Sequence, residues 1–552
     1  MTSTTSNSSL PSQPERAPAA WFSGRLACRP ALLLGLVVVA LLFALSLVLR
    51  AGDFRDDAIE QNMETSLHVL QTVHSLNALP ISQSFMLPSV TLGNPGDKGI
   101  SWGATLPTKA GVYIYTSFGP IGFVMPWLFF KLTGLAPTAH NLLFFNATLG
   151  FASALLLFAV LFRMLTLTGY GNRTALFCGV LGASLLIFSR EGLHTFGMAY
   201  WNQSIEQIWL LAQLLILLAI AARPSPRLLA GLAVVSFLSA STEWSGIVGN
   251  VLMAAYFWVQ ARRTPIAAVG PRPYSLPARL PHILFGATVV AFGVQLLHLF
   301  IALGISPALH ALLGRFIARG ATSARADLGM LISGYADSYG LYLVVAALAL
   351  GVLAFWPRRE QRPDIPAMLL LLAVFPLLEN LVMLQHAVMY TYDRMKLVTA
   401  LALVIALVLA RLIQYRARWP LALLSALVVL GAAQNLRQFN KLKAPMAAWP
   451  QVAQANAQLK QQIAQAVPLD CAVLGTNNRV RGYLNMLFDR SIYENQPSAD
   501  AFFQTAAGVK NCGAVFIQSS MDFTDLNTLN YALVKGPDGN VTKLTARRPD
   551  LR

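Results

Sequence analysis

Long runs of uncharged, apolar residues constrain the fold of this chain more than any other feature. The first run, 31–49, carries no charged residue and is about as long as a bilayer-spanning helix, which needs roughly 20 residues. Charged residues make up only 12% of the chain, against about 25% in ordinary soluble domains. Together these features predict an α-helical polytopic membrane protein with about 11–13 transmembrane helices. The apolar runs are 31–49, 141–162, 174–188, 205–222, 227–243, 245–260, 281–303, 339–356, 366–384, 397–413 and 418–436.

Basic residues between these runs indicate the orientation, because cytoplasmic loops collect Lys and Arg. Arg16, Arg25 and Arg29 precede the first run, and the segment 261–280 contains four Arg and no acidic residue. We therefore expect residues 1–30 to form a cytoplasmic tail, with the first run as an uncleaved signal anchor. The layout favours a bacterial inner membrane. The net charge of +17 follows from this topology and predicts no nucleic-acid partner.

One apolar segment, 112–133, does not fit the alternation of sides. A full crossing there would invert every later loop, and its Gly119-Pro120 and Pro126 would interrupt a helix. We expect a broken or re-entrant segment; a true crossing paired with another, unrecognised one is the alternative.

The pattern divides the chain into a membrane module, 31–436, and a soluble domain, 437–552, with 50–116 as the first external loop. In the soluble domain, helix-like and strand-like stretches alternate, which predicts a small α/β unit outside the cytoplasm. Cys471 and Cys512 each precede a strand-like run. They form either a disulfide, which an oxidising compartment permits, or two buried thiols.

Ionisable residues gather near the predicted outer boundary in three places. Asp56 and Asp57 follow the first span, and such a pair can bind a metal or act as a general base; the alternative is a solvated acidic turn. Ionisable groups beside spanning helices are costly and usually face a cavity or a partner, although interfacial anchoring explains some of them. The other two groups comprise Arg190, Glu191, His194, Asn202 and Glu206, and His386, Arg394 and Lys396.

The order of these features resembles the GT-C superfamily of membrane glycosyltransferases, which includes protein mannosyltransferases and lipid A aminoarabinose transferases. In that superfamily an acidic residue or pair follows the first span, as Asp56-Asp57 does. A basic residue precedes a Pro- and Tyr-rich apolar segment, which Lys109 and 108–134 resemble, although the usual double proline is missing. FSREGLH (188–194) and QHAVMYTYDRMKLVTALAL (385–403) resemble two later motifs. The resemblance covers roughly 31–413.

This resemblance implies transfer of a sugar from a polyprenyl-phosphate donor to a lipid, glycan or protein acceptor. Asp56 or Asp57 would remove the acceptor proton, and a divalent metal such as Mg²⁺ or Mn²⁺ could join them, since only some GT-C enzymes need one. The leaving phosphate needs cations. The residues expected to bind substrate or phosphate are Lys109, Arg190, Glu191, His194, Asn202, Glu206, His386, Arg394 and Lys396.

Three other functions fit parts of the pattern. A transporter or flippase of lipid-linked glycans is the main alternative, but it would place polar residues near the bilayer midplane and often contain inverted repeats. An O-antigen ligase or polymerase usually has its key loop late in the chain. A scaffold whose soluble domain does the work would not need Asp56 or Asp57.

Overall fold

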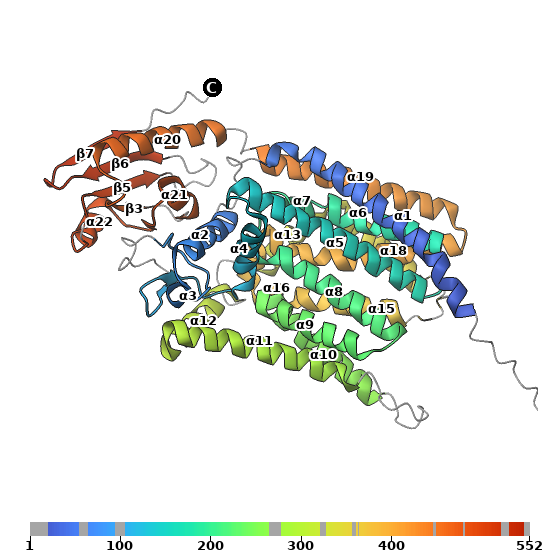
Figure 1. Cartoon of the computed structure of the whole chain (residues 1–552). Helices are drawn as coiled ribbons and strands as arrows, with labels where there is room; N and C mark the ends of the chain where they lie inside the picture. Colours follow the sequence, from blue (N-terminus) through green and yellow to red (C-terminus); the bar gives the residue numbers. More distant parts are fainter. Residues whose placement is uncertain are drawn as a thin grey trace, which may run out of the picture.

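A helical bundle with a small mixed sheet attached at one end makes up the computed structural model (Figure 1). The structure describes residues 20–54, 64–93, 105–263, 278–320, 327–355, 360, 362, 364–444, 449–477, 481–509, 511–519 and 529–545.

The bundle contains the long apolar helices predicted from the sequence. These are α1 (Ala20–Leu49), α5 (Ala139–Leu167), α6 (Asn172–Phe188), α8 (Asn202–Ala222), α9 (Pro226–Thr242), α10 (Trp244–Arg263), α11 (Leu280–Leu303), α14 (Leu341–Phe355), α15 (Asp364–Val374), α18 (Leu397–Gln414) and α19 (Arg418–Lys443). Within the described residues, seven helical segments are long and apolar enough to cross a membrane, or eight if the bent pair at Leu328–Tyr339 and Leu341–Phe355 is one span. The multi-pass helical membrane fold is confirmed, and the full number of crossings stays a prediction.

Short elements cover the end of the bundle next to the soluble domain. They are η1 (Ala51–Asp53), α2 (Glu64–Ala78), α3 (Ile81–Ser84), β1 (Leu106–Pro107), β2 (Tyr113–Ile114), α4 (Ile121–Thr133), α7 (Arg190–Thr195), α12 (Ile305–Arg319), α13 (Leu328–Tyr339), η5 (Phe375–Leu378), α16 (Glu379–Val382), α17 (Leu384–Met389) and η6 (Thr391–Lys396). Several of these carry the polar motifs, and we call this end, next to the C-terminal domain, the outer end of the bundle.

The segment 112–133 is interrupted, as its Gly and Pro residues predicted. Its first residues pair as β2 with β1, and α4 starts only after Pro120. With 13 residues, α4 is about 20 Å long, shorter than the roughly 30 Å hydrocarbon core. The extended stretch before α4 instead contributes side chains to the outer end of the bundle.

The C-terminal domain is a five-stranded sheet of order β4-β3-β5-β6-β7. Its elements are α20 (Trp449–Ala466), β3 (Val473–Thr476), α21 (Arg481–Phe488), β4 (Ile492–Tyr493), α22 (Ala499–Ala506), β5 (Ala514–Ser519), β6 (Leu529–Lys535) and β7 (Val541–Thr545). Strands β3, β4 and β5 are parallel, and β6 and β7 add an antiparallel edge. Cys471 and Cys512 form a disulfide with their Cα atoms 5.4 Å apart.

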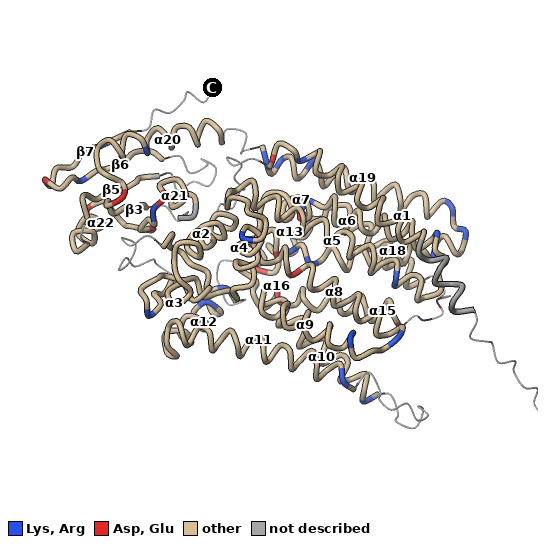
Figure 2. Tube along the Cα trace, in the orientation of Figure 1, with Lys and Arg blue, Asp and Glu red and all other residues tan. Residues whose placement is uncertain are grey.

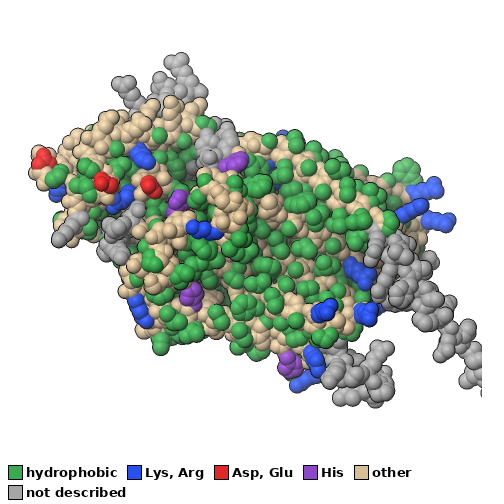
Figure 3. Space-filling view, in the orientation of Figure 1, with side chains coloured by type: hydrophobic (Ala, Val, Ile, Leu, Met, Phe, Trp, Pro, Cys, Tyr) green, Lys and Arg blue, Asp and Glu red, His purple; other side chains and the backbone are tan. Residues whose placement is uncertain are grey.

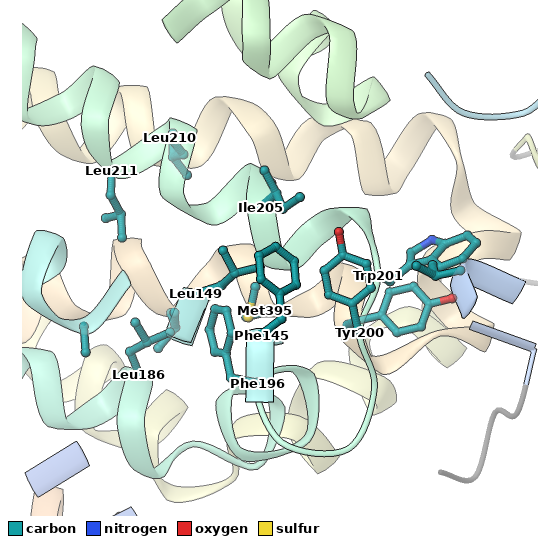
Figure 4. Packing of buried hydrophobic residues seen from close by; sticks show 14 of the residues in the cluster. Phe145, Leu149, Leu186, Phe196, Tyr200, Trp201, Ile205, Leu210, Leu211 and Met395 are labelled. Atoms are coloured by element: carbon teal, nitrogen blue, oxygen red, sulfur yellow. The ribbon is translucent and has the colours of Figure 1, made fainter. Parts of the chain in front are cut away.

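The bundle packs around a core where α5, α6, α8 and η6 meet. Figure 4 shows Phe145, Leu186, Ile205 and Met395, one from each of these elements, among the buried side chains of this core. At the outer end of the core, Trp201 packs edge-on against Phe118 with ring centroids 5.3 Å apart. The apolar core therefore ends directly beneath the elements that carry the polar residues.

Charge is distributed unevenly along the bundle. Lys and Arg gather at the ends of α10, α15, α18 and α19 that point away from the C-terminal domain (Figure 2). The side of the bundle visible in Figure 3 is largely apolar, as a lipid-facing surface would be. The basic end of the bundle therefore lies away from the C-terminal sheet, and the orientation in the membrane stays a prediction.

Candidate functional site at the outer end of the bundle

Two stretches far apart in sequence, 189–206 and 379–396, converge at the outer end of the bundle. Helix α7 contacts η6, and η6 also contacts α8, α17 and α18. Ser189 begins α7 because its side chain accepts a hydrogen bond from the backbone N–H of Gly192, which is a standard N-cap. The chain thus brings two of the three predicted polar groups together.

Lys396 is the centre of the first buried polar group. Its Nζ donates to Glu379 Oε2 at 2.6 Å and to Asn380 Oδ1 at 3.2 Å. Both charged side chains are about 4% exposed. A buried charge needs a partner to offset its desolvation, so Lys396 is committed to this pair.

His386 belongs to the same group through Asp393. The imidazole Nδ1 contacts Asp393 Oδ2, and the side-chain amide of Gln203 donates to Asp393 Oδ1. All three side chains are buried. Asp393 is thereby held by partners from α17 and α8 and fixes the orientation of His386.

Arg394 forms the second buried polar group, with Glu191. Its guanidinium lies 3.7 Å from Glu191 Oε1, and it donates to Ser338 Oγ at 2.9 Å and to the carbonyl of Ala387 at 2.8 Å. His194 lies nearby and shares a hydrogen bond of 3.0 Å with Thr391. These contacts tie α7, α13, α17 and η6 together.

Arg190 borders this second group from a less buried position. Its backbone N–H donates to Asn435 Oδ1, and its guanidinium donates to the carbonyl of Asp337 at 3.0 Å. It therefore links α7 to α13 and α19.

Glu206 and Asn202 extend the polar region into α8. Ser239 Oγ donates to Glu206 Oε1 at 2.6 Å, and Asn202 Nδ2 donates to the carbonyl of Thr242 at 3.3 Å. Both bonds join α8 to the outer end of α9. Glu243 follows α9 directly and is only 4% exposed.

A pocket that is partly open to solvent lies beside these groups. Its lining combines carboxylates and His386 with residues of the amphipathic helix α12. The lining residues are Ser117, Phe118, Glu243, Trp244, Leu312, Arg315, Phe316, Arg319, Glu379, Met383 and His386.

Tyr115, from the interrupted segment before α4, holds the two arginines of the cavity. Arg319 donates to the Tyr115 hydroxyl at 2.6 Å, and the Arg315 guanidinium lies 5.0 Å from the centre of the Tyr115 ring. Both arginines are partly buried. The cavity therefore has a cationic wall next to a carboxylate wall, which is suited to a ligand that carries both an anionic group and hydrogen-bond donors.

Lys109 lies apart from these groups. Its side chain is exposed in the turn between β1 and β2, and its backbone N–H bonds to the carbonyl of Ala302. The segment 108–134 does contribute to the cavity, but through Tyr115, Ser117 and Phe118.

Asp56 and Asp57 lie outside the described residues, so their predicted role stays a prediction. The described residue that precedes this pair is Phe54. Next to it, Lys443 Nζ donates a hydrogen bond to Asp53 Oδ1 at 2.9 Å. Among the described residues, no group of three or more His, Cys, Asp or Glu side chains is arranged to hold a metal ion.

The sequence analysis did not identify Arg315 and Arg319 as candidate anion ligands. It also missed Glu379, which sits within an apolar run. The presence of an acidic residue in that run could have identified Glu379, because a charged residue inside a spanning segment usually has a buried partner.

These elements together have the GT-C fold of membrane glycosyltransferases, as the resemblance implied. No protein-family model matches the sequence. No curated protein is significantly similar to it in sequence.

Solved structures provide the match. ArnT from Cupriavidus metallidurans bound to undecaprenyl phosphate has a TM-score of 0.51 at 13% identity, covering 96% of this chain and 99% of that one. The Archaeoglobus fulgidus oligosaccharyltransferase tethered with an acceptor peptide has a TM-score of 0.54 at 12% identity, covering 93% and 74%. The archaeal oligosaccharyltransferase AglB from Archaeoglobus fulgidus, in complex with an inhibitory peptide and a dolichol-phosphate, has a TM-score of 0.52 at 12% identity, covering 94% and 75%.

Proposed function

We propose that this protein is a membrane glycosyltransferase that moves a sugar from a polyprenyl-phosphate donor to an acceptor on the outer face of a bacterial inner membrane. One observation carries the proposal: within a GT-C fold, one cavity at this end of the bundle is lined by Arg315 and Arg319 and also by Glu243 and Glu379. Solved proteins with this fold were captured with undecaprenyl phosphate and with a dolichol-phosphate. A donor of this class supplies the anion, the sugar and the lipid chain.

In this proposal Arg315 and Arg319 bind the donor phosphate. They sit on α12, whose apolar Leu313, Phe316 and Ile317 are exposed, as expected for a helix lying at a membrane surface. A polyprenyl chain could therefore stay in the bilayer while its phosphate reaches the cavity. Arginine suits this role because its planar guanidinium pairs with two phosphate oxygens at once.

The reaction breaks the bond between the anomeric carbon and the phosphate oxygen and forms a bond from the acceptor atom to that carbon. The electron pair of the broken bond stays on the polyprenyl phosphate, whose increased negative charge the arginines stabilise. Asp56 or Asp57 takes the acceptor proton. A divalent metal at this acidic pair is compatible with the same scheme.

The buried pairs act as positioning groups. Lys396 with Glu379 and Arg394 with Glu191 join η6 to α16 and α7, so they fix the carboxylate wall of the cavity. Binding a phosphate directly would require each cation to leave its buried partner. We therefore assign Arg394 and Lys396 to the frame of the site, with His194, Asn202 and Glu206.

The disulfide between Cys471 and Cys512 supports the predicted placement of the C-terminal domain outside the cytoplasm, where disulfides persist. Helix α12, which lines the cavity, lies at the end of the bundle next to this domain (Figure 1). The acceptor therefore belongs to the extracytoplasmic compartment, as a lipid, a glycan or a protein.

The test measures sugar transfer by the full-length protein in lipid nanodiscs, with a panel of undecaprenyl-phosphate sugars and bacterial envelope extract as acceptor. Asp56→Asn, Asp57→Asn and the double variant Arg315→Ala/Arg319→Ala are compared with Arg418→Ala, which changes an exposed arginine at the opposite end of the bundle. We expect transfer by wild type and the control, with a loss of at least about a hundredfold in the arginine double variant and in one of the Asp variants.

Full activity of the arginine double variant would contradict the phosphate assignment, and full activity of both Asp variants would remove the proposed base. Binding of undecaprenyl-phosphate sugars without any transfer, together with their movement between leaflets, would favour the flippase alternative.

A further inference from the structure

Two polar atoms of residues that line the cavity have no hydrogen-bond partner within the described residues. Glu243 Oε2 and Ser117 Oγ are both buried, and both residues line the cavity. A buried carboxylate oxygen without a donor is costly, so such atoms in a cavity indicate where a ligand's donors bind.

The carboxylate of Glu243 is held in a fixed orientation. Its Oε1 accepts a hydrogen bond of 3.2 Å from the backbone N–H of Trp244, at the turn between α9 and α10. The other oxygen, Oε2, is therefore the one left for a ligand. Lys396 is close enough to interact with Glu243 electrostatically, but its hydrogen bonds go to Glu379 and Asn380.

Trp244 adds an aromatic wall to the same cavity. Its Nε1 donates to the carbonyl of Ser117 at 3.0 Å, which fixes the indole ring. Phe118 and Phe316 also line the cavity. An aromatic ring offers its face to the C–H groups of a sugar ring, whereas a carboxylate accepts hydrogen bonds from the hydroxyl groups at the ring's edge.

We propose that Glu243 and Trp244 form the subsite for the donor sugar and select a sugar with free, adjacent hydroxyl groups. This inference rests on the proposed function, because the sugar reaches the subsite on a phosphate held by Arg315 and Arg319. Glu243 Oε2 accepts from the hydroxyls, Ser117 Oγ adds a third hydrogen bond, and the indole of Trp244 covers one face of the ring. A deoxy sugar at this position leaves the carboxylate without its donors and binds poorly.

The test compares two kinds of ligand on the full-length protein in nanodiscs: bare undecaprenyl phosphate, and a panel of undecaprenyl-phosphate hexoses and pentoses. Dissociation constants are measured by microscale thermophoresis. We expect at least one sugar-bearing ligand to bind more tightly than bare undecaprenyl phosphate. Glu243→Gln should raise the dissociation constant of that ligand by roughly ten- to a hundredfold and leave that of bare undecaprenyl phosphate unchanged.

Two further variants complete the test. One removes the indole ring of Trp244, and the other is a control for the change from carboxylate to amide. Trp244→Leu should raise the dissociation constant of the sugar-bearing ligand by roughly two- to tenfold. It should also leave the dissociation constant of bare undecaprenyl phosphate unchanged. Asp538→Asn makes the same chemical change on an exposed carboxylate of the C-terminal domain and should affect neither ligand. Melting temperatures confirm that each variant is folded.

The outcomes separate this inference from the proposed function. If wild type binds bare undecaprenyl phosphate and every sugar-bearing form equally, or if Glu243→Gln weakens both ligands alike, the sugar subsite is wrong while the donor class stands. If bare undecaprenyl phosphate does not bind, or binds equally well to Arg315→Ala/Arg319→Ala, the phosphate assignment fails and this inference fails with it.

Discussion

Replacing Lys396 with methionine should destabilise the protein strongly, because the lysine is surrounded by buried carboxylates. Its Nζ lies 2.6 Å from Glu379 Oε2, and it also interacts electrostatically with Asp393 and Glu243. Methionine has a similar length and no charge. The substitution therefore leaves Glu379 buried without its cation.

Removing one partner of a buried ion pair typically costs about 3–5 kcal/mol. At about 2–4 °C of melting temperature per kcal/mol, the range for domains of 150–250 residues, this predicts a drop of roughly 6–20 °C. Adding Glu379→Gln to Lys396→Met removes the stranded charge, so the double variant should recover more than half of the loss. Recovery is incomplete because Glu243 and Asp393 still lack the lysine charge.

The assay is thermal unfolding of the purified protein in one detergent, at one scan rate, because proteins of this size often unfold irreversibly. Wild type, Lys396→Met, Glu379→Gln and the double variant form a complete cycle. If Lys396→Met melts within about 1 °C of wild type, or if the double variant is no more stable than Lys396→Met, the ion pair does not hold this part of the site.

Two other predictions concern the frame around the site. Cys471→Ser/Cys512→Ser should make the C-terminal domain more sensitive to limited proteolysis in intact membranes. The reason is that a disulfide spanning 41 residues contributes about 4 kcal/mol to stability in the loop-entropy account. Equal protease resistance with and without the disulfide would contradict this prediction. Gly122→Ala should lower the free energy of unfolding by about 1–3 kcal/mol, because the new methyl group would lie 1.8 Å from Asn202 Oδ1. A lower melting temperature would report this loss. Gly293→Ala, which meets no atom within 4 Å, is its control and should not lower it.

Local patterns in the sequence predicted local structure well. The apolar runs became helices, and Gly119-Pro120 marked the point where 112–133 changes from strand to helix. In the soluble domain, the stretches 472–475 and 514–518 became β3 and β5. The antiparallel strands β6 and β7 were not predicted, because their side chains alternate weakly between buried and exposed positions.

The composition of the cavity could not be predicted in the same way, since it depends on contacts between distant segments. Tyr115 and Arg319 are 204 positions apart, and Gln203 and Asp393 are 190 apart. Hydrophobic periodicity shows which face of a helix is buried but not which helix packs against it. The predicted residues of 189–206 and 385–396 were found because buried charge is rare in a membrane protein, whereas Lys109 was assigned from a motif that matches only partly.

The separation of cations into two classes explains how one site can be both rigid and able to bind an anion. Arg394 and Lys396 lie in the interior, and each is held by a carboxylate and by further hydrogen bonds. Moving either to a phosphate would strand a buried carboxylate, at a cost similar to that predicted for Lys396→Met. Arg315 and Arg319 lie on the partly exposed surface helix, where a bound phosphate replaces water. Phosphate binding should therefore depend on the arginines of α12. The shape of the part of the site that faces the sugar should depend on the buried ion pairs behind it.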